Sequence, residues 1–211
     1  MPPKSRKNAV GAPTKEELMR AAILETAYEV FQRYGIRKTT LDDIAIAMGK
    51  RRSFLYYYFE SKEELLRCVG ENEIAANVAS IHEAVERQTT VEGKMRTFFV
   101  GPLRQTMDRM KFFTKISEDL RSGDGQLLVM MRSLRASFDL RERALLAKIL
   151  REGIAKGVFR PMTDSAIESF VLFTLSAQRG IEMDLVLRDS AQDPLDSLED
   201  ILDVFLRGLR P

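Results

Sequence analysis

The most chemically distinctive residues of this chain are a run of cations followed closely by aromatic side chains. The run consists of Lys50, Arg51, Arg52 and Ser53, with Tyr56, Tyr57 and Tyr58 directly behind. Arginine and lysine bind phosphate oxygens, and arginine also pairs with guanine through two hydrogen bonds. Phenolic hydroxyls hydrogen-bond to phosphates. The run therefore predicts contact with a nucleic acid.

The rest of the chain offers little material for catalysis or metal binding. His82 is the only histidine and Cys68 the only cysteine. The chain therefore lacks the residues for a histidine-dependent triad and for a metal site built from several His and Cys ligands. The segment Gly123-Asp124-Gly125 is too short and too acidic for a phosphate-binding loop. We expect a protein that is not an enzyme and holds no cofactor and no metal.

Charge is unevenly distributed along the 211 residues. The formal net charge is only +2, yet residues 1–59 hold eleven Lys and Arg against six Asp and Glu. This basic segment predicts a polyanionic partner for the N-terminal part alone. A single cysteine, an N-terminus without an apolar run and the lack of roughly 18 consecutive apolar residues predict a cytoplasmic protein without a membrane segment.

Helix-start signals place the cationic run within a group of helices. Thr14, Thr40 and Ser61 each precede an acidic residue by three positions, which is the spacing of a capping box. The first helix is expected to end at Gly35. A long helix is expected from Ser61 to about Gln88. Further helices are expected at about 91–110, with a break near Gly101-Pro102, and at 114–121, 126–156, 163–187 and 194–209. The pattern predicts an all-α fold.

The segment from Thr39 to Tyr58 has the pattern of a helix-turn-helix. Apolar residues on a first helix are expected to be buried (Leu41, Ile44, Ala45 and Met48), as are Leu55 and Phe59 on a second. Gly49 lies where the chain must turn between two crossing helices. The second helix would present its cations at its N-terminal end, as major-groove reading requires. A helical hairpin with merely solvated cations is the alternative, which the basic segment disfavours.

This segment resembles the DNA-binding domain of TetR-family transcriptional regulators. The matching residues are Thr39-Thr40, Asp43-Ile44-Ala45, Gly49, Leu55-Tyr56-Tyr57-Tyr58-Phe59 and Ser61-Lys62-Glu63-Glu64-Leu65, and the resemblance covers about residues 15–66. Looser similarity lies in Glu152-Gly153-Ile154 and Gly157-Val158-Phe159. Departures from the family pattern at Lys50, Arg51, Ser53 and Phe54 alter the tip that reads bases, so no operator preference transfers.

The resemblance implies an all-α protein of three segments. These are a flexible basic arm at 1–13, a three-helix helix-turn-helix domain at 14–60 and a helical effector-binding and dimerisation domain at 61–211. The implied function is a sequence-specific transcriptional regulator, with repression relieved by a small apolar or amphipathic effector. An effector-independent architectural or cell-division factor of the same fold is the alternative.

Each implied activity has its candidate residues. Contact with a palindromic operator in double-stranded DNA is expected from Thr40, Lys50, Arg51, Arg52, Ser53, Tyr57 and Lys62, and Tyr56 is expected in the core. The arm residues Lys4, Arg6 and Lys7 could reach a minor groove or stay solvated. The candidate effector pocket is Phe98, Phe99, Met107, Met110, Phe113, Met130, Met131, Phe138 and Phe173, with plain core as the alternative.

A homodimer is expected because helix-turn-helix proteins gain affinity and specificity from two heads on one site. The resemblance implies that the last two helices of each subunit form the interface. The candidate interface residues are Phe170, Ala177, Ile181, Leu185, Leu198, Leu202, Phe205 and Leu209. Packing inside one subunit is the alternative interpretation of these positions.

Overall fold

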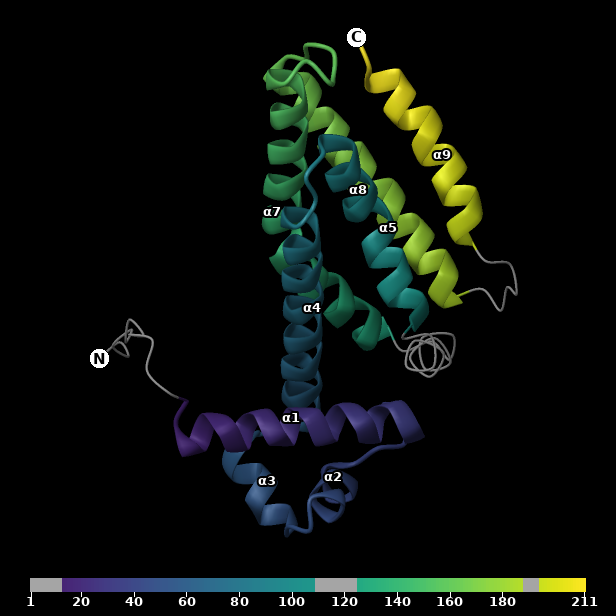
Figure 1. Ribbon diagram of the computed structural model, residues 1–211. Helices are drawn as coiled ribbons and strands as arrows, with labels where there is room; N and C mark the ends of the chain where they lie inside the picture. Colours follow the sequence, from purple (N-terminus) through teal and green to yellow (C-terminus); the bar gives the residue numbers. More distant parts are fainter. Residues whose placement is uncertain (1–12, 109–124, 188–193) are drawn as a thin grey trace.

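The computed structural model describes residues 13–108, 125–187 and 194–211, and its regular elements there are all α-helices. Helices α1 (Lys15–Tyr34), α2 (Leu41–Ala47) and α3 (Arg52–Tyr58) form a small domain at one end (Figure 1). Helix α4 (Lys62–Glu86) runs from it into a larger helical domain. That domain contains α5 (Val91–Asp108), α7 (Gly125–Ala155), α8 (Asp164–Leu187) and α9 (Pro194–Leu209). The predicted all-α fold is confirmed.

Side-chain caps fix the starts of the first two helices. The Thr14 hydroxyl accepts from the Glu17 N–H at 3.1 Å, while the Glu17 carboxylate accepts from the Thr14 N–H at 2.8 Å. Thr40 and Asp43 repeat this capping box, and the Thr40 hydroxyl and then its backbone N–H lower the pKa of the Asp43 carboxyl. The negative charge therefore persists at the positive end of α2.

The third expected capping box is only half formed. The Ser61 hydroxyl accepts from the Glu64 N–H at 3.1 Å, as predicted. The Glu64 carboxylate, however, accepts from the N–H of Glu60 at 2.7 Å, one residue before the cap. The Glu64 carboxylate therefore holds the link between α3 and α4 at Glu60, whereas the capping-box spacing predicts a bond to the N–H of Ser61.

Two groups of buried side chains stabilise the fold, and α4 belongs to both. The small domain is built on Ile23, Ala27, Phe31, Ile44, Leu55, Phe59, Leu65 and Val69. The larger domain is built on Ile81, Val85, Met95, Phe98, Leu146, Ile149, Leu150, Phe159, Leu202 and Leu206, among others. Because α4 contributes Leu65 and Val69 to the first core and Ile81 and Val85 to the second, it connects the domains as a packed element.

Charged side chains attach α5 to its neighbours. Arg96 of α5 pairs with both Glu199, at 2.7 Å, and Asp203 of α9. Lys94 of α5 donates to Glu152 of α7 at 2.7 Å. The hydrogen bonds from Lys156 and from Lys94 lower the pKa of the Glu152 carboxyl to about 2. These contacts place α9 beside α5 on one side of the larger domain.

Helix α5 is continuous through Pro102, so the expected break near Gly101-Pro102 is wrong. Proline lacks the N–H that would bond to the carbonyl four residues earlier and normally kinks a helix. Here Pro102 and Leu103 are buried against neighbouring helices, and this packing offsets the lost bond. The helix expected at 114–121 and residues 1–12 of the arm lie outside the described residues. In the described part of the chain, no helix is long and apolar enough to cross a membrane.

The end of α7 packs against its own turn through a glycine. The N–H groups of Val158 and Phe159 both donate to the Gly153 carbonyl, at 2.9 and 3.1 Å. This places the buried Phe159 ring directly over Gly153, where an added Cβ would overlap the ring carbons. The family-like residues at this turn therefore form a local packing unit.

We expect Gly153→Ala to lower the free energy of unfolding by about 1–3 kcal/mol, because the methyl group forces Phe159 out of its site. Gly101→Ala is the matched control, since its Cβ would meet Ile81 at an ordinary 3.7 Å. That control should leave stability unchanged or raise it by up to about 1 kcal/mol. Urea unfolding followed by circular dichroism measures both, and equal responses would contradict this packing.

Candidate nucleic-acid interface

A tight turn sets α2 against α3. The N–H of Lys50 donates to the Ala45 carbonyl at 2.8 Å, and Ala45 is buried where the two helices meet. Gly49 has a φ of +64°, in the left-handed region that favours glycine. Leu55 and Phe59 fill the small core behind α3. The opposite side of α3 is thereby directed outward, at the far end of the molecule from α8 and α9 (Figure 1).

The outward side of α3 is basic and aromatic. Lys50, Arg51, Arg52 and Ser53 are exposed at its first turn, and Tyr57 is 74% exposed one turn later. The Lys50 ammonium lies 5.5 Å from the centre of the Phe54 ring, a cation–π contact that keeps this charge beside the helix. Five of the seven sequence-predicted DNA contacts are therefore grouped on one short helix and the residues that lead into it.

Arg52 is already engaged by two side chains within the domain. Its guanidinium donates to the Asp42 carboxylate at 3.0 Å and to the Tyr56 hydroxyl at 2.8 Å. The hydrogen bond to Tyr56 and then the charge of Asp42 raise the pKa of Arg52. Tyr56 was expected in the core, but it is 44% exposed. Its ring turns toward Arg52, one helical turn earlier, because Leu55 and Phe59 occupy the core behind α3.

The other two predicted contacts, Thr40 and Lys62, lie with Arg52 around an open hollow of about 380 Å³. The Thr40 hydroxyl is used in the cap of α2, where it bonds to Asp43 at 2.7 Å. The Lys62 ammonium donates to the Ile36 carbonyl at 3.1 Å. Both residues therefore also hold the helices of the domain in place.

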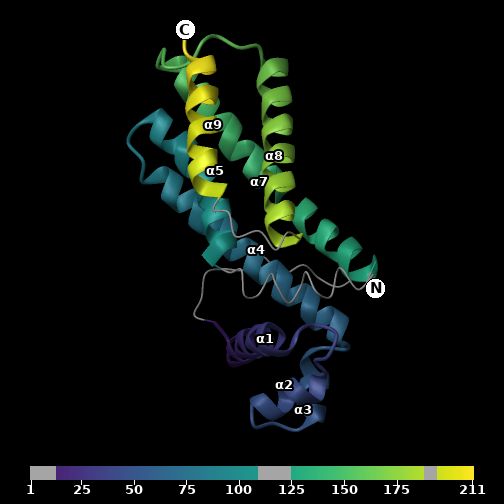
Figure 2. The same cartoon turned by 90° about the vertical axis from the view of Figure 1, so that its right-hand side faces the viewer.

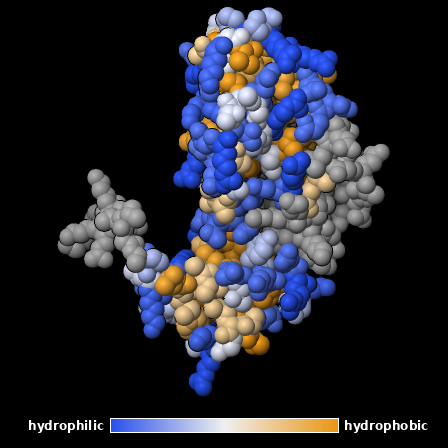
Figure 3. All heavy atoms as spheres, in the orientation of Figure 1, coloured by the Kyte–Doolittle hydropathy of each residue, from blue (hydrophilic) through white to orange (hydrophobic). Residues whose placement is uncertain are grey.

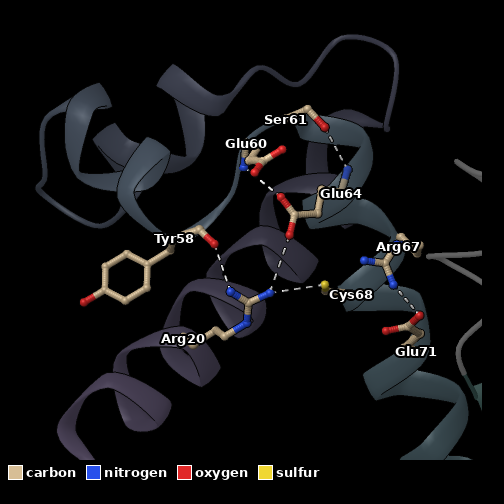
Figure 4. A network of polar contacts seen from close by, with 8 residues as sticks. All are labelled: Arg20, Tyr58, Glu60, Ser61, Glu64, Arg67, Cys68 and Glu71. Carbon is tan, nitrogen blue, oxygen red and sulfur yellow. Dashed lines mark hydrogen bonds and ion pairs between the residues drawn. The ribbon is translucent and has the colours of Figure 1, made fainter. Parts of the chain in front are cut away.

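Arg20 of α1 joins three helices, although the sequence interpretation did not single it out. Its guanidinium donates to the Tyr58 carbonyl at the end of α3 at 2.9 Å and lies 3.8 Å from the Glu64 carboxylate of α4 (Figure 4). It also contacts the Cys68 sulfur at 3.6 Å and lies over the Phe59 ring at 4.2 Å.

The sequence did carry a signal for Arg20. It precedes Ile23 and Ala27 by three and seven residues, so it shares their buried helix face. A cation on an apolar stripe indicates a partner inside the domain.

A family model described as bacterial regulatory proteins, tetR family, matches residues 23–69, which run from α1 into α4. The HTH-type transcriptional regulator YfiR of Bacillus subtilis (strain 168), itself uncharacterized, is 25% identical over 201 residues, covering 92% of this chain and 94% of that protein. The chain belongs to the TetR family. The α2–α3 unit is thus the helix-turn-helix of a TetR-family DNA-binding transcriptional regulator.

Two further TetR-like proteins have informative names. The probable acrEF/envCD operon repressor of Escherichia coli (strain K12) is 35% identical over 79 residues, which are 36% of this chain and 34% of that repressor. Among solved structures, the transcriptional regulator FadR from Bacillus subtilis in complex with stearoyl-CoA has a TM-score of 0.66. The two sequences are 18% identical, and the match covers 92% of this chain and 100% of the FadR chain. This similarity shows a common fold.

The structure does not bring the predicted Met and Phe pocket residues together. Phe98 is in the main core, whereas Met130 packs against the core of the small domain. Phe138 is half-buried near Arg141, and only Phe99 and Phe173 line one cavity, between α5, α8 and α9. Met107 is half-buried in the last turn of α5. Met110, Phe113 and the Met131 side chain lie outside the described residues.

The scatter of these Met and Phe residues over separate places has a simple cause. Met and Phe fill cores as readily as cavities, and spacing along separate helices does not say which helices meet. In the described residues, no three His, Cys, Asp or Glu side chains gather in a way that could hold a metal ion.

Helices α8 and α9 lie side by side and run in opposite directions (Figure 2). Their outer side exposes large apolar residues, namely Leu172, Phe173, Ile201 and Val204, which we call the α8–α9 apolar surface. Elsewhere, hydrophilic residues cover much of the larger domain in the view of Figure 3. An exposed cluster of apolar side chains is typical of a protein interface.

Several predicted interface residues must be reassigned. Leu198, Leu202 and Leu209 are buried in the core of the subunit, so they belong to its interior. Phe170, Ile181 and Phe205 are half-buried, Ala177 is exposed, and the Leu185 side chain lies outside the described residues. Helix α9 is apolar on two sides, and its spacing alone does not reveal which side packs on α5.

Replacing Arg20 tests its role in positioning α3. Arg20→Gln removes the charge that pairs with Glu64 and the bond to the Tyr58 carbonyl, so we expect DNA affinity to fall at least about tenfold. Arg20→Lys should recover part of it. The control is Arg67→Gln, because Arg67 bonds to Glu71 within α4 only (Figure 4). Fluorescence anisotropy with a duplex selected from random DNA measures affinity, and an unaffected Arg20→Gln variant would reject this role.

Proposed function

We propose that the protein is a homodimeric repressor that binds a palindromic operator through α3 and is released by a small apolar or amphipathic effector. The observation that carries the proposal is the exposed basic and aromatic side of α3, which the buried Leu55 and Phe59 hold outward. A short helix with cations at its leading end fits the major groove, where base edges are distinct.

The predicted DNA-contact residues have separable roles in this proposal. Arg51, Arg52 and Ser53 lie at the leading end and would read base edges, while Lys50, Tyr57 and Thr40 would contact phosphates. Lys62 would act mainly by holding α4 to the loop before α2, since its ammonium donates to the Ile36 carbonyl. The basic approach to α3 should also make binding strongly salt-dependent, because each neutralised phosphate releases counterions.

The ion pair with Asp42 should make the contact of Arg52 with DNA selective for certain bases. To bind DNA, Arg52 must exchange the Asp42 carboxylate and the Tyr56 hydroxyl for new partners. A guanine edge replaces both hydrogen bonds at once, with its O6 and N7 acceptors. Other base edges offer this guanidinium fewer acceptors, so the intramolecular pair should penalise binding at the wrong sequence.

A second subunit would supply the second reading head. One seven-residue helix contacts few base pairs, and two heads about 34–36 Å apart reach successive major grooves. The α8–α9 apolar surface is suited to self-association because its four large side chains are 52–71% exposed in one subunit. Isologous packing of this surface about a two-fold axis that runs along the molecule would place the two small domains at the same end of the dimer.

Repression and release are supported by relatives and by the continuity of α4. The Escherichia coli relative is named an operon repressor, and the Bacillus subtilis FadR structure contains stearoyl-CoA. In this chain α4 is packed into both cores, so a change in the larger domain can displace the small one. An effector would act by favouring an arrangement in which the two heads no longer fit successive grooves.

Arg52→Ala should weaken binding to a selected operator about tenfold or more and relax base preference at one position of each half-site. Arg104→Ala, an exposed arginine on α5, is the control for the loss of one charge. Gel-shift titrations at fixed salt against the selected duplex and its single-base variants measure both effects. An Arg52→Ala variant with wild-type affinity would remove Arg52 from the reading set.

Ile201→Glu and Phe173→Glu should each convert the dimer into monomers, because they place charge on the α8–α9 apolar surface. Leu140→Glu is the matched control, since Leu140 is 78% exposed on α7 rather than on α8 or α9. Sedimentation velocity at micromolar concentration reports the oligomeric state, and circular dichroism confirms the helical fold. Dimers that persist in both variants would place the interface elsewhere.

A further inference from the structure

Helix α4 contains a glycine at the point where it leaves the small domain. Gly70 directly follows Val69 of the small-domain core and lies inside a helix of 25 residues. Glycine is disfavoured in a helix interior relative to alanine, so its presence there indicates a packing requirement. A Cβ at position 70 would lie only 2.7 Å from the Leu134 Cδ1 of α7. Gly70 therefore allows Leu134 to approach the backbone of α4 closely.

The same part of α7 also contacts the small domain. Met130, one helical turn before Leu134, packs against the small-domain core. Gly70, Met130 and Leu134 together form what we call the α4–α7 contact. An open hollow of about 570 Å³ borders it, with Met130 and Leu134 on its wall. Close-packed cores resist displacement, whereas this hollow leaves room for the two side chains of α7 to shift.

The far end of α4 is fixed in the larger domain, because Ile81 and Val85 are buried in its core. At 1.5 Å per residue, Gly70 lies about 16 Å along the helix from Ile81, and Lys62 at the start of α4 lies about 28 Å from it. A sideways movement at Gly70 that pivots at Ile81 is therefore enlarged about 1.7-fold at Lys62. Small changes in the α4–α7 contact would thus move the small domain by more than they move α7.

We propose that the α4–α7 contact sets the tilt of α4 and, through it, the distance between the two α3 helices of the dimer. Met130 and Leu134 are then positioning residues for DNA binding, which act on α3 through α4. The inference rests on the proposed function, for which it names the side chains that transmit a change in the larger domain to the small one. The competing interpretation is close packing at Gly70 that stabilises the fold without affecting the position of α3.

The closing experiment places a wedge in the α4–α7 contact. Gly70→Leu sets a new side chain against Leu134, so it should force α4 and α7 apart and weaken binding to a selected palindromic operator at least about tenfold. The loss should be smaller for a duplex with one base pair inserted or removed between the half-sites, because the distance between the heads has changed. Combining Gly70→Leu with Leu134→Ala makes room again and should restore most of the affinity and the original spacing preference. Fluorescence anisotropy titrations of the full chain measure both.

Gly153→Ala is the matched control, because it disturbs the packing of α7 near the opposite end of that helix. It should leave the operator affinity and the spacing preference of the folded protein unchanged. Gly70→Ala is a smaller wedge that keeps the test valid if Gly70→Leu does not fold, and circular dichroism establishes which variants are folded.

The two claims fail in different ways. A wild-type spacing preference in every folded Gly70 variant, or an equal change in Gly153→Ala, would overturn the inference alone. A wild-type protein that binds no selected duplex would reject the proposed function instead.

Discussion

Helix α3 has only seven residues, and an isolated helix of that length is unstable in water, so its position depends on contacts from other helices. Leu55 and Phe59 supply the apolar contact, and Arg20 supplies the polar one by bonding to the Tyr58 carbonyl. The same guanidinium reaches Glu64 of α4. The outward presentation of the cations of α3 thus depends on α1 and α4, and a movement of α4 relative to α1 would strain these contacts.

This dependence connects the two proposed activities. Helix α4 is buried at one end in the small domain and at the other in the larger domain, where it packs with α5 and α7. The α8–α9 apolar surface belongs to two helices that pack against α5 and α7. Under the proposed function, an effector bound in the larger domain would act on DNA binding through subunit spacing and through the tilt of α4, without touching α3.

Local rules predicted the small domain well, because its signals lie within a few residues of one another. The caps at Thr14 and Thr40 and the turn at Gly49 depend on short-range spacing, and the structure contains all three. The predicted roles of the DNA-contact residues stay predictions.

Long-range packing explains what the sequence did not reveal. Pro102 stays helical because neighbours bury it, and Leu202 packs inward because α5 lies on that side of α9. Thr174 and Gln178 look like ordinary polar residues of a helix until their burial is known.

The most direct test of the central claim varies the spacing of the operator. A selected palindromic duplex is compared with one in which five base pairs are inserted between the half-sites, which turns one half-site to the opposite face of the DNA. If two α3 helices bind together from one dimer, the affinity of the full chain should fall at least about tenfold on insertion. Equal affinities for the two duplexes would contradict the account.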